Sequence, residues 1–396
     1  MAGNDSAPML PRATALAGRR HRLILSLLLA LLAAPLAQAL DWQVEVTPVG
    51  ELYPALHWSA RAGGGDGLVA VVVSGARAGT ELRARLTTPG LRAPAVAVAT
   101  ATGGEVILRP RLVWDASALR EVDTVRRQRL QVTLDAGDQV LQRQLEVRLH
   151  PLDEAAYYIR DGAVRVDLSW AFAAYVDPLD PAIDLLLADA DRLAAGRAGD
   201  SDGAPPAQRR LRGAWAALAA RGVRYDATDP ALARGPAVWS QRVRSASQVL
   251  RERRANCIDG SVLVASLLER MGLRAQIVLV PGHAFVGYQV PGGTTMVHLE
   301  TTLLGAVDFD AALRAGRQRW RRAAPRLDGH HAPDYALIDV GTARSYGIIP
   351  LGAALRDAEA DAVPGTGGAD VASCATGSPA AQGSQRCETR SSHSRP

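Results

Sequence analysis

Short runs of alternating apolar and polar residues occupy the first third of the chain, at 42–46, 68–73, 82–86, 106–112, 130–134 and 140–149. Turns rich in Gly and Asp separate several of these runs, as at 63–67 and 135–138. Regularly spaced short strands with such turns are typical of an antiparallel β-sandwich of immunoglobulin-like type. We therefore predict a β-sandwich domain over residues 40–152.

The pattern changes near Trp170 from alternation to helical spacing. Apolar residues recur at helical intervals in 183–193 and 211–220, with a Gly/Asp/Pro loop between them at 196–206. A further short helix or turn is expected at 248–254, and a longer helix followed by three strand-like runs at 256–302. Together these elements predict an α+β domain over residues 160–352. From residue 363 onward the chain contains few apolar residues, so we expect a disordered tail over 363–396.

The segment 256–302 has the most regular pattern of the chain. Asp259 and Ser261 are residue types whose side-chain oxygens accept free N–H groups at a helix start, and Gly272 ends the apolar helical run. Cys257 therefore lies at the N-terminus of a largely buried helix. The dipole of such a helix favours a thiolate, so we expect a lowered pKa for Cys257.

The N-terminus has the features of a targeting segment. Four arginines precede an apolar run at 23–34, and the sequence Ala37-Gln38-Ala39 follows it. A basic region, a short apolar region and an A-x-A site predict a secretory signal over residues 1–39, cleaved after Ala39. The apolar run is shorter than the roughly 18 residues that a membrane-spanning helix requires, and no later run is longer. We expect a secreted or periplasmic protein with no transmembrane segment after cleavage.

Net charge and composition limit the classes of partner that are expected. Residues 1–39 contain four Arg and one Asp, so removing them lowers the formal net charge from +5 to +2. The basicity is therefore mostly a property of the signal, and nucleic acid is not an expected partner. None of the 45 basic residues is lysine. This chain consequently has no ε-amino group through which it could be cross-linked to itself.

Three cysteines are present, which is an odd number for an exported protein. Cys374 and Cys387 lie together in the Gly/Ser-rich tail and are able to pair with each other. Cys257 is then left over. An unpaired thiol in an oxidising compartment is either buried and inert or used for chemistry, and the count alone does not separate these interpretations.

The residues that follow Cys257 favour chemistry. His283 begins the second strand-like run after the helix, and Glu300 lies at the end of the third. A thiol nucleophile requires a base within hydrogen-bond reach and a carboxylate that orients the base. Cys257, His283 and Glu300 are therefore the predicted catalytic residues. His298 is a rival to His283, which we prefer because it opens a strand after Pro281-Gly282, and Asp308 is a rival to Glu300.

These residues resemble a known family. Asn256-Cys257-Ile258-Asp259-Gly260-Ser261 is similar to the Cys-helix of bacterial transglutaminase-like domains, which belong to the papain-like cysteine superfamily. The run from Val280 to Val286 resembles their His strand, and Glu300-Thr301-Thr302 matches their acid-Thr-Thr ending, with Glu in place of the usual Asp. The resemblance covers roughly residues 160–350, and its specific motifs lie between residues 256 and 302.

The resemblance implies acyl transfer through a thioester on Cys257, acting on a protein or peptide substrate such as one of the cell envelope. Peptide or amide hydrolysis is favoured over transamidation. The backbone N–H of Cys257 is the expected first oxyanion donor, and Gln248, Asn256 and Trp239 are the candidates for the second. No cofactor is expected. The alternative is a catalytically inactive fold that serves as a binding or structural module.

Two further clusters of charged or histidine residues are interpreted as exposed surface residues. The adjacent His330 and His331 lack other spaced ligands, so no metal site is predicted. Six arginines between residues 314 and 326 are expected to form a solvated face that is able to contact an anionic polymer: Arg314, Arg317, Arg319, Arg321, Arg322 and Arg326.

Overall fold

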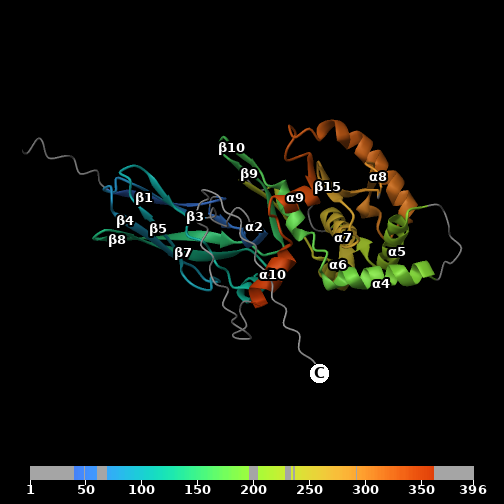
Figure 1. Cartoon of the computed structure of the whole chain (residues 1–396), viewed down its shortest axis with the longest axis horizontal. Coiled ribbons are helices and arrows are strands. Elements are labelled where there is room, and N and C mark those ends of the chain that lie inside the picture. The colour runs from blue at the N-terminus through green and yellow to red at the C-terminus, as the bar shows by residue number, and fades with distance from the viewer. Residues whose placement is uncertain are drawn as a thin grey trace, which may run out of the picture.

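The computed structural model describes residues 40–48, 50–59, 69–195, 204–227, 233–234, 237–290 and 292–360. The protein is mixed α/β with several sheets, and its strand-rich and helix-rich parts lie side by side along the longest axis (Figure 1). The predicted signal at 1–39 and the predicted tail at 363–396, with Cys374 and Cys387, lie outside the described residues.

Two sheets form the N-terminal part. The smaller has the order β1-β3-β6 and the larger the order β2-β8-β7-β4-β5. All neighbours in these sheets are antiparallel except β2 and β8, which are parallel. The strands are β1 (Asp41–Val46), β2 (Glu51–Leu52), β3 (Val69–Ser74), β4 (Glu81–Thr87), β5 (Ala95–Thr100), β6 (Val106–Leu108), β7 (Arg126–Ala136) and β8 (Gln139–Leu149).

The core of these sheets is formed by side chains that alternate along each strand with exposed ones. Leu82, Ala84 and Leu86 of β4 are fully buried while the residues between them are exposed, and β7 buries Leu130, Val132 and Leu134 in the same way. The sequence prediction did not contain β5, which is an Ala/Val run without clear alternation, or the short helices α2 (Pro54–Ser59) and α3 (Ala116–Arg120).

A third sheet joins the two parts, with the order β10-β9-β13-β12. Its strands are β9 (Glu154–Asp161), β10 (Val164–Asp167), β12 (Ala233–Arg234) and β13 (Val238–Arg242). At this junction the buried His150 lies between two carboxylates, with Nε2 2.6 Å from Glu51 and Nδ1 3.0 Å from Glu154. Both ring nitrogens of His150 therefore lie against carboxylates at the junction.

The helix-rich part is built around a sheet of order β17-β16-β15-β18. Helix α7 (Cys257–Arg270) packs against β15 (Ala275–Val280) and β16 (His283–Gln289), so the helix and two strands predicted for this segment are found close to their predicted bounds. The other strands are β17 (Met296–Leu299) and β18 (Ala336–Asp339). The helices that precede α7 are η1 (Ser169–Tyr175), α4 (Pro181–Ala195), α5 (Pro206–Ala220) and α6 (Ala246–Glu252).

The segments after β17 lie over this sheet and then return to the N-terminal part. They are η2 (Thr301–Leu303), α8 (Phe309–Ala323), η3 (Ala324–Arg326), α9 (Val340–Ser345) and α10 (Leu351–Ala360). Helix α8 packs on β17, whereas α10 contacts α2, α3 and η1 (Figure 1). Leu351 and Ala354 of α10 are buried. The last described helix therefore fastens the two parts of the molecule together.

Candidate active site

The N-terminus of α7 is fixed by a reciprocal cap. Oδ1 of Asn256 accepts hydrogen bonds from the N–H groups of Ile258 (3.0 Å) and Asp259 (2.9 Å), and Asp259 accepts the N–H of Asn256 (3.0 Å). Cys257 is the first residue of the helix, as predicted. The prediction for Ser261 is wrong, because its hydroxyl donates to the carbonyl of Cys257 (2.7 Å) instead of accepting a free N–H.

The Cys257 thiol is enclosed. The residue is 2% exposed, and the backbone N–H groups of Ala284 and Ile258 lie close enough to the thiol to lower its pKa. Burial raises the pKa of the thiol to about 11, since removal from water outweighs these two N–H donors. The expected lowering of the pKa by the helix start is therefore wrong: the thiol is protonated at neutral pH. The effect of the Ala284 N–H nevertheless places the thiol near the first residues of β16, and Ala284 follows His283 in the sequence.

His283 and Glu300 form the predicted pair. Nε2 of His283 lies 3.0 Å from Oε2 of Glu300, and the Glu300 side chain is 2% exposed. The other oxygen of Glu300 accepts the N–H (3.1 Å) and the hydroxyl (2.7 Å) of Thr302. Burial alone would raise the pKa of Glu300, but the hydrogen bond and charge of His283, with Thr302 and Arg319, lower it to about 2. Glu300 is therefore ionised and held in one orientation.

Arg319 is a member of this site that the sequence did not single out. Its Nε lies 2.5 Å from Oε2 of Glu300, the same oxygen that contacts His283. It was predicted only as one residue of a solvated arginine face. The side chain is 43% exposed, so one end of the guanidinium group reaches the buried acid while the rest faces water.

Neither rival residue takes part in this pair. Asp308 caps α8 by accepting the N–H of Ala311 (2.7 Å). His298 is 1% exposed, its Nε2 lies 2.9 Å from Nε2 of Gln276, and its ring stacks on Trp320 with centroids 4.0 Å apart. The Gln276–His298 contact spans three strands because Gly287 separates them in the register, and a Cβ at Gly287 would lie within 3 Å of both side chains.

A close approach of two segments brings the acid to the helix. A Cβ on Gly260 would lie 3.0 Å from the Cβ of Thr301, so only glycine allows the first turn of α7 to contact η2 without a shift. The hydroxyl of Thr301 also lies 3.4 Å from the carbonyl oxygen of Cys257. Gly260 and Thr301 thus hold Glu300 near the Cys257 end of the helix.

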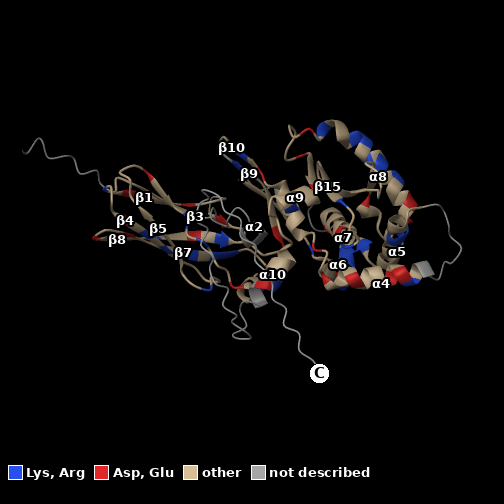
Figure 2. Ribbon diagram, in the orientation of Figure 1, with Lys and Arg blue, Asp and Glu red and all other residues tan. Residues whose placement is uncertain are grey.

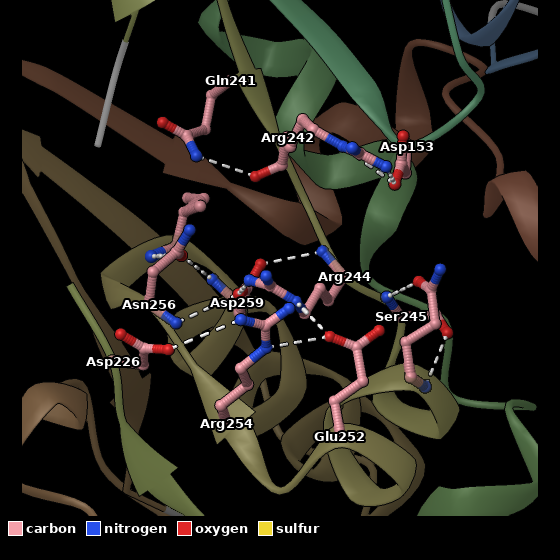
Figure 3. A network of polar contacts seen from close by, with 12 residues as sticks. Asp153, Asp226, Gln241, Arg242, Arg244, Ser245, Glu252, Arg254, Asn256 and Asp259 are labelled. Carbon is pink, nitrogen blue, oxygen red and sulfur yellow. Dashed lines mark hydrogen bonds and ion pairs between the residues drawn. The ribbon is translucent and has the colours of Figure 1, made fainter. Parts of the chain in front are cut away.

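A network of charged residues contacts the N-terminal cap of α7 through Asp259 (Figure 3). Asp259 is fully buried and accepts from the N–H of Arg244 (2.8 Å) and from its guanidinium (2.8 Å). Arg244 continues to Glu252 (3.0 Å), Glu252 to Arg254 (3.1 Å), and Arg254 to Asp226 (3.6 Å). Burial raises the pKa of Asp259, and the donated hydrogen bonds offset that shift only in part.

The candidate oxyanion donors differ in their surroundings. Gln248 caps α6, with its side-chain oxygen accepting the N–H of Ser245 (2.7 Å), and Trp239 packs against Tyr157 and Tyr158. Asn256 is 2% exposed, and its Nδ2 is buried without a hydrogen-bond partner. A buried amide N–H₂ group without a hydrogen-bond partner is rare and costs free energy. Nδ2 of Asn256 is therefore available to donate to a bound oxygen atom one residue from Cys257.

Tyr225 is a second residue that sequence reasoning missed. It lies on β11 (Arg224–Tyr225), which pairs in parallel with β14 (Arg254–Ala255), so that Tyr225 is opposite Ala255. Burial raises the pKa of Tyr225, and the charges of Cys257 and Glu300 raise it further. The phenol therefore lies near both groups while remaining 38% exposed. No local motif marks it, because the strand pairing is between segments 30 residues apart.

No group of three or more metal-ligating side chains occurs among the described residues. His331 contacts Asp328 at 3.0 Å and is exposed, as is His330. Within the described part of the chain, no helix is long and apolar enough to span a bilayer.

No protein-family model matches this chain, and no curated protein matches it.

Proposed function

We propose that this protein is an exported, transglutaminase-like enzyme that carries out cysteine-dependent acyl transfer, with Cys257 as the nucleophile. The observation that carries the proposal is the His283–Glu300 pair, with 3.0 Å between Nε2 and Oε2, together with the effect on the Cys257 thiol of the N–H of Ala284, the residue after His283. A β-sandwich followed by a transglutaminase-like domain is the arrangement proposed for the two parts. The substrate is a protein or peptide in or near the cell envelope.

The chemistry starts from a neutral thiol. Nε2 of His283 is engaged with Glu300, so Nδ1 is the nitrogen left to take the thiol proton. As the sulfur attacks the carbonyl carbon, its proton moves to His283, and Glu300 stabilises the resulting imidazolium. His283 then gives this proton to the leaving amine as the C–N bond breaks. A thioester on Cys257 remains.

The second half of the reaction decides the product. Water or an amine loses a proton to His283, attacks the thioester carbon and releases the thiolate, which takes the proton back. The N–H of Cys257 and the free Nδ2 of Asn256 are the proposed donors to the oxyanion in both halves. We propose hydrolysis as the main outcome. Product analysis with an excess of a primary amine tests this, since an amine adduct as the main product would overturn it.

The activated pair is tested by alkylation of Cys257 with iodoacetamide against pH, in a variant with Cys374 and Cys387 replaced by Ser. We expect labelling to begin near neutral pH through His283 and to lose this limb in His283→Ala, which then labels only as the thiol ionises near pH 11. Identical profiles for the two proteins would refute the proposed pair.

A binding or structural module is the second candidate function. The observation that favours it is the burial of Cys257, whose thiol is protonated and 2% exposed. The same alkylation profile separates the two candidates. A module without chemistry gives one late ionisation that does not depend on His283.

A further inference from the structure

A cavity lies at the junction between the N-terminal part and the helix-rich part of the molecule. Its volume is about 550 Å³, and small-molecule sites occupy about 300–1,000 Å³. Helices α3 and α10 line it together with η1, the start of α4, the end of β13 and α6 (Figure 1). Cys257, His283 and Glu300 do not line it. This space, which we call the junction cavity, is therefore separate from the candidate active site.

Apolar side chains from both parts of the molecule line the junction cavity. They come from α3 and the turn after it, from the segment between β8 and β9, and from α10. An occupant with apolar side chains would therefore leave water for apolar contacts on two sides. The residues are Leu119, Val122, Leu152, Leu351 and Leu355.

The charged side chains of the junction cavity are balanced in sign. Four arginines and four aspartates line it, so its formal net charge is zero. Helix α8 has mostly basic residues, whereas acidic and basic residues occur together on the elements around α6 and α10 (Figure 2). A ligand with one charge of each sign matches such a lining better than a polyanion or a polycation. The residues are Arg120, Arg242, Arg251, Arg356, Asp123, Asp153, Asp177 and Asp180.

One wall of the junction cavity is held by charges that pair with each other. The two carboxylate oxygens of Asp177 lie 3.1 and 3.2 Å from the guanidinium group of Arg356. Both oxygens of Asp180 accept hydrogen bonds from Ser247. A Cβ on Gly352 would overlap Oδ2 of Asp177, so α10 lies directly against this wall. The wall is therefore preformed, and its carboxylates are already satisfied.

Asp153 and Arg251 differ from these pairs. Oδ2 of Asp153 accepts the guanidinium group of Arg242 at 2.5 Å (Figure 3), but Oδ1 is buried without a hydrogen-bond partner in the part of the chain that the structure describes. A buried carboxylate oxygen without a donor is rare. Arg251 is exposed and has no acidic partner among the described residues. The cavity therefore offers an acceptor to a ligand N–H group and a cation to a ligand carboxylate.

We propose that the junction cavity binds a short apolar peptide with free termini. The ammonium group of the peptide donates to Oδ1 of Asp153, its carboxylate accepts from Arg251, and its side chains lie against the leucines of α3 and α10. An apolar tripeptide has the size of the ligands that cavities of this volume hold, and it supplies one charge of each sign. Because Cys257 does not line the cavity, this inference does not rest on the proposed acyl transfer.

Binding is measured by isothermal titration calorimetry on the full-length mature protein carrying Cys257→Ser, so that no acyl transfer consumes the ligand. The probe is trileucine. N-acetyl-trileucine lacks the ammonium group, trileucine amide lacks the carboxylate, and triserine lacks the apolar side chains. We expect each of these three to bind about tenfold more weakly than trileucine, because each loses one class of contact.

Two variants assign the charged contacts. In Arg251→Gln, trileucine should bind about tenfold more weakly, while trileucine amide, which has no carboxylate to lose, should change by less than about twofold. In Asp153→Asn, the same pattern is expected with N-acetyl-trileucine as the insensitive ligand. Arg111→Gln and Asp138→Asn make the same changes at exposed positions that do not line the cavity, and they should leave trileucine binding within about twofold.

Absence of trileucine binding would overturn the proposal, as would equal affinity for trileucine and its two capped forms. An equal loss for all the peptides in Arg251→Gln and Asp153→Asn would also overturn it, because the variants would then disturb the junction instead of removing one contact. Failure of the acyl-transfer proposal appears separately, as a Cys257 labelling profile that does not depend on His283, and it leaves the calorimetry unchanged.

Discussion

The N-terminal strands and the segment 256–301 bury very different side chains. Of the described residues between 41 and 149, only Glu51 is both polar and buried, whereas the shorter segment contains eight: Asn256, Asp259, Ser261, Ser266, Gln276, His298, Glu300 and Thr301. Burying a polar group costs free energy unless it finds a partner. The contrast teaches that the strands bury almost only apolar side chains, while the α7–β17 region holds polar groups in fixed positions, as the proposed chemistry requires.

Charge pairs show the same contrast. On the strands, pairs such as Arg127–Glu146 are exposed and contribute little. Around α7, the side chains of Arg244 and Asp259 are 13% and 0% exposed. Loss of either charge would therefore leave the other buried without its partner and lower the stability of the fold.

The largest expected effect comes from removing one partner of the buried pair. Arg244→Met leaves the Asp259 carboxylate buried without its cation, and we expect the free energy of unfolding to fall by about 3–5 kcal/mol. Arg127→Met, the matched change at an exposed pair, should cost less than about 1 kcal/mol. Urea unfolding at pH 7 measures both. Similar losses in the two variants would remove the contrast between the regions.

Acidification should affect the two regions unequally through His298. Burial lowers its pKa from 6.5 to about 4, so between these pH values the unfolded chain binds a proton that the folded protein does not. Stability is therefore lost as the pH falls from about 6.5 to 4, by about 3 kcal/mol from this group. In His298→Gln the slope over this window should be shallower, whereas replacement of the exposed His330 by Gln should leave it unchanged. An unchanged slope in His298→Gln would contradict the assignment.

Close backbone contact should make one glycine intolerant. Gly316→Ala pushes a methyl group against the His298 backbone, and we expect a loss of about 2 kcal/mol in unfolding free energy. Gly341 lies in α9, and the nearest atom to an added Cβ there is Oδ1 of Asp339 at an ordinary 3.5 Å, so Gly341→Ala should change stability by less than about 0.5 kcal/mol. Thermal melts of the two variants provide the measurement, and equal melting temperatures would show that α8 is free to move off β17.

The smallest effect on stability is expected for Arg319→Gln. The side chain is 43% exposed, so water screens its pair with Glu300, and the loss should be under about 1 kcal/mol. Arg319 also lowers the pKa of Glu300, so the pKa should rise without it. The His283-dependent limb of Cys257 alkylation should then change although the fold does not. A loss above about 3 kcal/mol would make Arg319 a structural residue instead.

Local signals predicted the centre of the site well. The helix start at Cys257, the helix end near Gly272 and the strand beginning at His283 each depend on neighbouring residues, and they lie where the sequence placed them. Residues contributed by distant segments were missed. Arg319 reaches Glu300 from α8, Tyr225 arrives through β11, and the role of Gly260 depends on Thr301, 41 residues away.

The pKa of the Cys257 thiol also depends on distant segments and was therefore not predicted from the local sequence. The sequence reveals a helix start, which favours a thiolate, but not how many atoms cover it. In the folded protein, burial by surrounding segments exceeds the effect of the helix. Burial is a sum over the whole chain, so no local pattern predicts its size.

The contacts of helix α10 bear on how the strand-rich and helix-rich parts evolve together. It follows the thiol-bearing part in the sequence but rests on α2 and α3, which belong to the N-terminal part. Exchange of either part between proteins would therefore break this contact and uncover Leu351 and Ala354. The strand-rich and helix-rich parts should accordingly be passed on as one unit and not shuffled as independent modules.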